Sequence, residues 1–147
     1  NAVKKATALA RHTGLPAVAD DTGREVDALG GRPGVHAARY AGEGATYENN
    51  WRKLIRELEG VRKERRRARF ITVAAVAMPS AKVAIAEGSL EGLITEAPAG
   101  TQGFGYDPVF FVPEVGKTLA QLTPAEKNRI SHRARAFAKV REILLKL

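Results

Sequence analysis

Two adjacent aspartates, Asp20 and Asp21, directly follow the apolar residues 16–19. The apolar run is typical of a short buried strand, which is predicted to end at the two carboxylates. Because side chains alternate across a strand, one carboxylate would otherwise lie on the buried face, where an unpaired charge is very costly. A magnesium ion accounts for the pair, since Mg²⁺ prefers hard oxygen ligands and needs only one or two carboxylates from the protein. An ordinary Asx-type turn over residues 20–23 explains the same residues equally well.

A glycine-rich loop over residues 100–108 places Phe104 between two glycines, with Asp107 shortly after it. An aromatic ring in such a loop can stack on a nucleobase, which is worth about 1 to 3 kcal/mol per base in single-strand binders. Backbone amides and Asp107 would then contact the edge of the base. The alternative is a glycine turn that packs Phe104 and Tyr106 into the core.

Residues 127–133 place Lys127, His132 and Arg133 at the predicted start of the last helix. A helix N-terminus binds anions through its free amides and its dipole, whereas cationic side chains there do not stabilise an isolated helix. Their presence therefore indicates a bound ligand. A structural salt bridge, and a purely structural role for His132, are the competing interpretations.

The most conspicuous charged segment is residues 62–69, with the sequence RKERRRAR. Such a run is typical of a solvated loop. Nucleic-acid binding is the alternative, but no aromatic residues interleave with the cations and no RNA- or DNA-binding motif lies nearby. We therefore do not expect nucleic acid to be the main partner.

Hydrophobic periodicity predicts the elements that must position these groups. We expect helices over residues 2–12, ended by Gly14, over residues 46–60, capped by Thr46, and over residues 131–147, capped by Ser131. Val- and Ile-rich runs predict a strand pair at residues 70–78 and 82–86 and a further strand at 109–112.

Composition limits the class of protein. A chain of 147 residues with 44% hydrophobic residues is long enough for one core, so one domain is expected. The net charge of +8 indicates an anionic partner. The absence of cysteine excludes disulfides and thiolate metal sites and fits the cytoplasm. No apolar stretch reaches the roughly 18 to 20 residues of a membrane-spanning helix, so a membrane partner is not expected.

The order and wording of these motifs resemble one family, the inosine triphosphate pyrophosphatases that remove non-canonical purine nucleotides. The resemblance covers nearly the whole chain. It is carried by Asn1-Ala2 with Lys5-Ala6, by residues 13–17, 19–23, 26–31, 33–35 and 38–40, by residues 103–108, and by residues 126–128 and 131–133. Several independent motifs in the family's order are much more specific than any one of them.

The resemblance implies an α/β fold with an elongated mixed β-sheet flanked by helices, and two lobes around a central nucleotide cleft. It implies one pyrophosphatase domain over residues 1–147, a homodimer, and a family strand-loop-helix that is missing before Asn1. Asp21 matches the catalytic base and metal ligand, and Asp20 would support a bound Mg²⁺. The substrate-binding residues implied are Lys5, Thr22, Phe104, Gly105, Tyr106, Asp107, Lys127, His132 and Arg133.

The expected reaction is hydrolysis of ITP, dITP or XTP to the monophosphate and pyrophosphate, by magnesium-assisted attack of water at the α-phosphorus. A 6-keto purine presents an acceptor where adenine presents an amino donor, so Lys127 and Arg133 would pair only with the former. The competing hypothesis is a non-catalytic nucleotide- or RNA-binding module that uses residues 62–69. Arg24 departs from the family, which usually has an apolar residue there.

Overall fold

The computed structural model describes residues 1–146, so Leu147, the last position of the predicted C-terminal helix, lies outside the described residues. The helices are α1 (Ala2–Thr13), α2 (Tyr47–Glu57), α3 (Pro124–Ile130) and α4 (His132–Leu145). The strands are β1 (Ala17–Val26), β2 (Pro33–Gly34), β3 (Arg67–Ala77), β4 (Val83–Ile94), β5 (Phe110–Val112) and β6 (Lys117–Thr118).

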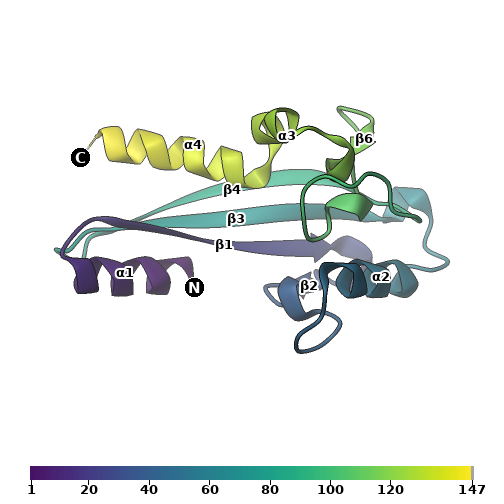
Figure 1. Ribbon diagram of the computed structural model, residues 1–147, viewed down its shortest axis with the longest axis horizontal. Coiled ribbons are helices and arrows are strands. Elements are labelled where there is room, and N and C mark those ends of the chain that lie inside the picture. Colours follow the sequence, from purple (N-terminus) through teal and green to yellow (C-terminus); the bar gives the residue numbers. More distant parts are fainter. Residues whose placement is uncertain (147) are drawn as a thin grey trace. The chain divides into compact units, whose positions relative to one another are not determined.

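The strands form one six-stranded sheet in the order β2-β1-β3-β4-β5-β6 (Figure 1). The pairs β1–β2, β4–β5 and β5–β6 are antiparallel. The predicted α/β class, with a sheet flanked by helices, is confirmed. The chain divides into two compact units. The first comprises Asn1–Thr22, Ile71–Ser89 and Ile130–Leu147, and the second comprises Gly23–Phe70 and Leu90–Arg129. The single domain and the central cleft stay predictions.

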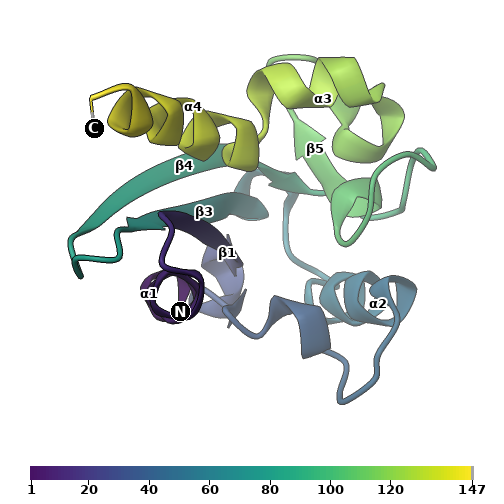
Figure 2. The ribbon, with the colours of Figure 1, turned by 60° about the vertical axis from the view of Figure 1, so that its left-hand side comes forward.

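In the first unit, the two faces of the sheet are covered by different helices (Figures 1 and 2). Ala75 and Ala77 of β3 pack with the buried alanines of α1. Their neighbours Ala74 and Val76 pack with α4 through Ala136 and Val140. This is the alternation of a strand buried on both faces, and within the first unit it fixes whether a β3 side chain meets α1 or α4.

Close packing of α4 on the sheet depends on Gly88 in β4. A Cβ atom at this position would collide with the α4 backbone at His132 and Ala136. Glycine in a strand interior commonly marks such a close approach of two backbones. The predicted capping of α4 is confirmed, since the Ser131 hydroxyl accepts a hydrogen bond from the Ala134 N–H at 3.1 Å.

In the second unit, α2 begins at a capping box. Thr46 accepts from the Asn49 N–H, and the Asn49 side chain accepts from the Thr46 N–H. The helix then buries Trp51 and Leu54, so the predicted amphipathic helix is confirmed, although it ends at Glu57 rather than near Gly60. The Phe70 and Phe110 rings, 3.9 Å apart between centroids, join β3 to β5 in the core.

Both central strands are longer than predicted. β3 begins at Arg67, inside the basic run, and β4 continues to Ile94, well beyond residue 86. Strand β4 alternates buried and exposed side chains along most of its length, as a sheet with one packed face requires. In residues 1–146, no helix has the length and apolar character needed to cross a membrane.

Candidate active site

The acidic pair lies within β1, not at its end. The strand runs on through Asp20, Asp21 and Thr22 to Val26, so the predicted strand end and the alternative Asx turn are both wrong. The strand continues because its polar side chains have hydrogen-bonding or charged partners while their backbone stays in the sheet. The hydroxyl groups of Thr22 and Thr72 share a hydrogen bond of 2.9 Å between strands β1 and β3.

The two carboxylates have partners on opposite faces of the sheet. Asp20 accepts from the Arg133 Nε at 3.0 Å, on the face covered by α4. Asp21 lies 3.8 Å from the Lys5 Nζ, on the face covered by α1. Consecutive residues of a strand point to opposite sides, so the alternation that predicted a buried charge instead separates the two groups. Lys5 also donates to the Asp20 backbone oxygen at 3.2 Å.

This arrangement decides how a metal ion would fit. Among residues 1–146, no group of three or more His, Cys, Asp or Glu side chains is placed to hold an ion. Magnesium, however, often binds one protein carboxylate and completes its shell with water and substrate phosphate oxygens. The partly exposed Asp21, with cationic Lys5 beside it, fits that requirement as a single hard oxygen ligand. Asp20, held by Arg133, lies on the other face.

The glycine-rich loop brings Phe104, Asp107 and Lys127 together in the second unit. The Asp107 side chain is 3% exposed, and its Oδ2 lies 2.5 Å from the Lys127 Nζ. The same oxygen accepts from the Phe104 N–H at 3.1 Å. The Lys127 ammonium lies over the Phe104 ring, 4.5 Å from its centroid, and Phe104 is 45% exposed. The cluster therefore offers a partly accessible ring with a fixed ammonium donor over it.

Tyr106 has a different environment from Phe104, although the two are neighbours in the same loop. Its ring is buried, and its hydroxyl donates to the Ala37 carbonyl at 2.7 Å. Burial raises the pKa of Tyr106, which keeps the hydroxyl protonated as a donor. The core-packing alternative for the loop is thus correct for Tyr106 and wrong for Phe104.

The aromatic rings near the glycine-rich loop explain the presence of Arg24. Its guanidinium lies 5.1 Å from the centroid of the Phe70 ring and 5.5 Å from that of Tyr106. Planar guanidinium groups stack well on aromatic rings. Arg24 thus packs against two aromatic rings, one of which belongs to the Phe104 loop. At position 24 the resembled family usually has an apolar residue.

Residues 127–133 do not form one helix start. Lys127 belongs to α3, which ends at Ile130, whereas only His132 and Arg133 lie in the first turn of α4. Ser131 separates the two helices because its side chain caps α4. Lys127 therefore joins the loop cluster of the second unit, while buried His132 and the Asp20-bound Arg133 belong to the first unit. A base pocket that all these residues share stays a prediction.

Comparison with known proteins shows which family the chain belongs to. The model of the Ham1 family matches residues 1–143. The chain belongs to the Ham1 family. It is 57% identical over 142 residues to the dITP/XTP pyrophosphatase of Geobacillus kaustophilus, covering 97% of this chain and 70% of that protein. It is 49% identical over 144 residues to the dITP/XTP pyrophosphatase of Bacillus subtilis, covering 98% and 73%.

Solved structures of the Ham1 family agree with the fold. The Ham1 protein of Staphylococcus aureus superposes with a TM-score of 0.93 at 39% identity, over 99% of this chain and 74% of that one. The nucleoside-triphosphatase, or dITP/XTP pyrophosphatase, of Mycobacterium abscessus superposes with a TM-score of 0.82 at 43% identity, over 95% and 74%. The resemblance noted in the sequence is therefore confirmed at the level of family and fold.

The basic run of this Ham1-family chain divides into structural and surface residues. Arg66 is fully buried and donates to the carbonyls of Ile94 at 2.8 Å, Leu58 at 2.7 Å and Thr95 at 2.8 Å. Burial lowers the pKa of Arg66, although a guanidinium stays charged in proteins. The prediction of a wholly solvated loop is wrong at this residue, because the Arg66 guanidinium donates hydrogen bonds to buried carbonyls.

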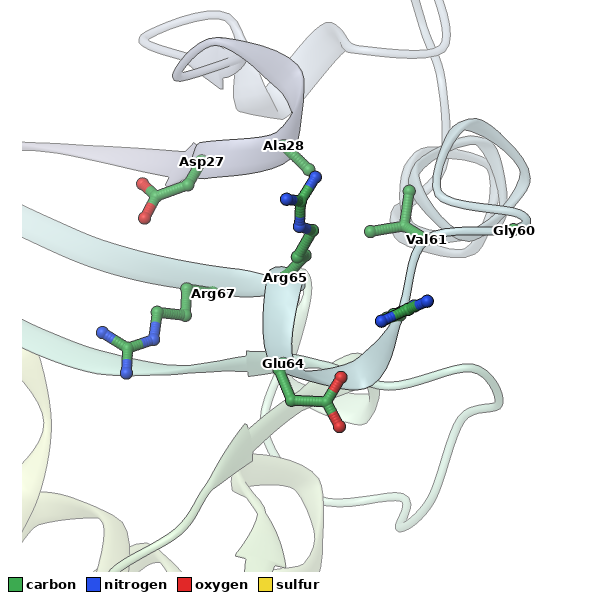
Figure 3. Close-up of a pocket in the computed structure, with 8 residues that line it drawn as sticks. Asp27, Ala28, Gly60, Val61, Glu64, Arg65 and Arg67 are labelled. Atoms are coloured by element: carbon green, nitrogen blue, oxygen red, sulfur yellow. The ribbon is translucent and has the colours of Figure 1, made fainter.

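The exposed arginines of the run border an open groove of about 830 Å³ in the second unit (Figure 3). Figure 3 shows Arg65 and Arg67 at this groove, with Asp27 and Glu64 nearby. Arg69, at the end of the run, instead lies within 4.0 Å of three carboxylates, those of Glu25, Asp27 and Glu91. Because Asp27 and Glu64 line the groove together with the arginines, the groove has mixed charge.

We expect Arg66→Lys to destabilise the protein by about 2 kcal/mol, because one ammonium cannot replace a fork that reaches three separated carbonyls. Urea unfolding followed by circular dichroism measures the loss. Arg65→Lys, in the exposed part of the same run, is the matched control and should unfold as the wild type does. Equal stability of the two variants would show that the Arg66 hydrogen bonds contribute nothing net.

Proposed function

We propose that this chain hydrolyses non-canonical purine nucleoside triphosphates, dITP, XTP and ITP, to the monophosphate and pyrophosphate. The observation that carries the proposal is the high identity, over nearly the whole chain, to relatives named dITP/XTP pyrophosphatases. The chemistry of the two clusters supports it. One offers a carboxylate and a lysine suited to a metal-bound phosphate, and the other offers a ring and a lysine suited to a purine.

The phosphate end of the substrate is assigned to Asp21 and Lys5. Lys5 has an exposed ammonium, which would pair with a phosphate oxygen. Asp21 would ligate Mg²⁺ through a carboxylate lone pair, and it would orient or deprotonate the attacking water by accepting its hydrogen. When bound, magnesium supplies positive charge that neutralises the phosphate oxygens as the α-phosphorus is attacked. Asp20 then acts through its ion pair with Arg133, which holds the first turn of α4 to β1.

The base end is assigned to Phe104, Lys127 and Asp107. Phe104 would stack on the purine, because its ring is the accessible aromatic of the loop. An ammonium has three donors, so Lys127 can keep its bond to Asp107 and donate another to a 6-keto oxygen. An adenine amino group would face that donor with a donor of its own. Discrimination follows from the unpaired group left in the adenine complex.

Two further properties belong to the proposal. We expect a homodimer and a cytoplasmic location, as in the family that the sequence resembles. Size-exclusion chromatography with light scattering tests the first property, and fractionation of the producing cell tests the second.

The proposed reaction is tested by incubating the purified chain with Mg²⁺ and dITP, XTP or ITP and measuring pyrophosphate and monophosphate. We expect pyrophosphate from all three substrates and much less from dATP. Omission of Mg²⁺ should stop the reaction. Release of single phosphates, or equal rates on dATP, would refute the proposed function.

A non-catalytic nucleic-acid-binding module is the competing function, and the arginine-lined groove is the observation that favours it. We expect the double variant Arg65→Gln/Arg67→Gln to hydrolyse dITP at the wild-type rate, because these side chains line a groove that includes neither assigned cluster. Steady-state kinetics measures the rate, and fluorescence anisotropy with a labelled single-stranded RNA measures binding. Salt-dependent RNA binding that the double variant abolishes, in a protein without turnover, would favour the module instead.

A further inference from the structure

A second exposed aromatic residue lies beside Phe104. Tyr47, the first residue of α2, has its ring centroid 6.2 Å from that of Phe104, with 43° between the ring planes. Tyr47 is 59% exposed. Both rings belong to the second unit, although they are far apart in sequence. Ligand sites are lined mostly by apolar and aromatic side chains with a few polar groups, so an exposed aromatic pair at a polar cluster suits a flat ligand.

The position of Tyr47 is fixed by the start of α2. The capping box of Thr46 and Asn49 holds the first turn. One residue further on, buried Asn50 donates to the Ala38 carbonyl at 2.9 Å and accepts from the Ala41 N–H at 2.8 Å. The first apolar residue that the helix buries is Trp51. Tyr47 is thus anchored by its backbone, while its own ring is not needed to fill the core.

We propose that Tyr47 is a substrate-binding residue that forms a side wall to the Phe104 stacking surface and contacts the purine nucleoside of the substrate. This inference rests on the proposed function. The tilt and spacing of the rings define the kind of contact. A purine sandwiched between two parallel rings needs a separation of about 7 Å, twice the roughly 3.5 Å contact distance. At 6.2 Å and 43° the two rings form an open corner and not a slot between parallel rings. A base stacked on Phe104 would therefore contact Tyr47 through the edge of the base or through the ribose.

The corner also has a polar side. The Lys127 Nζ lies 4.5 Å from the Phe104 centroid and is held by Asp107. A flat ligand on the accessible part of Phe104 would therefore lie near one ammonium donor and one aromatic wall. That combination suits a purine with a keto group, which has one polar edge and a large apolar face. Tyr47 adds affinity and orientation, whereas the water attack takes place at the phosphates.

The test separates binding of the nucleoside from binding of phosphate. Tyr47→Ala should raise the KM for dITP about five- to tenfold, the lower part of the range for removing an aromatic ring from a base, with kcat changed less than twofold. Tyr47→Phe should keep the wild-type KM because the ring remains. Inhibition by inosine monophosphate should weaken in Tyr47→Ala by a similar factor. Inhibition by inorganic tripolyphosphate, which has no base, should not change.

Phe137→Ala is the matched control, since Phe137 is also an exposed aromatic on a helix but belongs to the first unit. It should leave KM unchanged. Thermal unfolding of Tyr47→Ala should match the wild type, and Tyr47→Leu gives a second variant that keeps apolar bulk. If active wild type and Tyr47→Ala share one KM for dITP, or if tripolyphosphate inhibition falls as well, the inference is wrong. A wild type without pyrophosphate release would instead overturn the proposed function itself.

Discussion

Asp21→Asn is expected to lower kcat for dITP hydrolysis by about 10³-fold, within the range for loss of a catalytic acid-base group. The amide keeps the shape of the side chain but loses the charge that binds a cation and the basicity that activates water. Stability should change little, because Asp21 is partly exposed and its lysine partner is 3.8 Å away. Continuous pyrophosphate detection measures kcat, and a Mg²⁺ titration should show a higher half-saturating concentration.

Asp20→Asn is the matched control, since it makes the same chemical change one residue away. Its carboxylate lies on the α4 face, where it accepts from Arg133. We expect less than a tenfold loss of kcat, because only a positioning contact weakens. If both substitutions reduced kcat and Mg²⁺ affinity equally, the two aspartates would ligate the ion together, and the separation across the sheet would not hold in the working enzyme.

The acidic pair also shows how far sequence reasoning reaches. The two aspartates could be singled out as candidates from their types and order, because an unpaired buried carboxylate is costly, but an Asx turn explained them equally well and only the family resemblance assigned them roles. Their placement could not be predicted, because the partners of Asp20 and Asp21 come from α4 and α1, at opposite ends of the chain. When side chains distant in sequence pair with the polar residues of a strand, the local sequence does not show that the strand continues through them.

Strand β4 was underestimated for a related reason. Gly88 and Gly92 interrupt the apolar pattern in the way that turn glycines do, although both lie inside the strand. Each is required by a neighbour: a Cβ atom at Gly88 would collide with the α4 backbone, and one at Gly92 would collide with Phe110 and Phe111. Helices α1 and α2, by contrast, have local signals at their ends, Gly14 in the left-handed conformation and the Thr46 cap, and both were predictable.

Arg66 and Tyr47 are the residues that the sequence did not single out. Arg66 lies in a run of surface-like cations, and only the tertiary fold surrounds it with carbonyl oxygens. Tyr47 follows a helix cap and precedes an amphipathic helix, so its pattern is that of a solvent-exposed first turn. Its contact with Phe104 depends on the way α2 and a loop more than fifty residues later meet in one unit.

The strongest combined effect on folding and recognition is expected from Lys127→Met. The Lys127 side chain is 17% exposed and Asp107 3% exposed, so the substitution leaves a buried carboxylate without its cation. Removing one partner of a buried ion pair costs about 3 to 5 kcal/mol. The same change removes the donor assigned to the 6-keto oxygen, so the ratio of kcat/KM for dITP to that for dATP should fall by about 10- to 100-fold. Urea unfolding and competitive hydrolysis of the two nucleotides measure these effects.

Adding Asp107→Asn to Lys127→Met separates the two roles of the lysine. The amide removes the uncompensated charge and can still accept the hydrogen bond from the Phe104 N–H, so most of the lost stability should return. Discrimination between dITP and dATP should not return, because no ammonium faces the base in either variant. If the double variant recovered both properties, Lys127 would act on the base only by holding the loop. If Lys127→Met alone kept wild-type discrimination, the assignment of Lys127 to the base would be wrong.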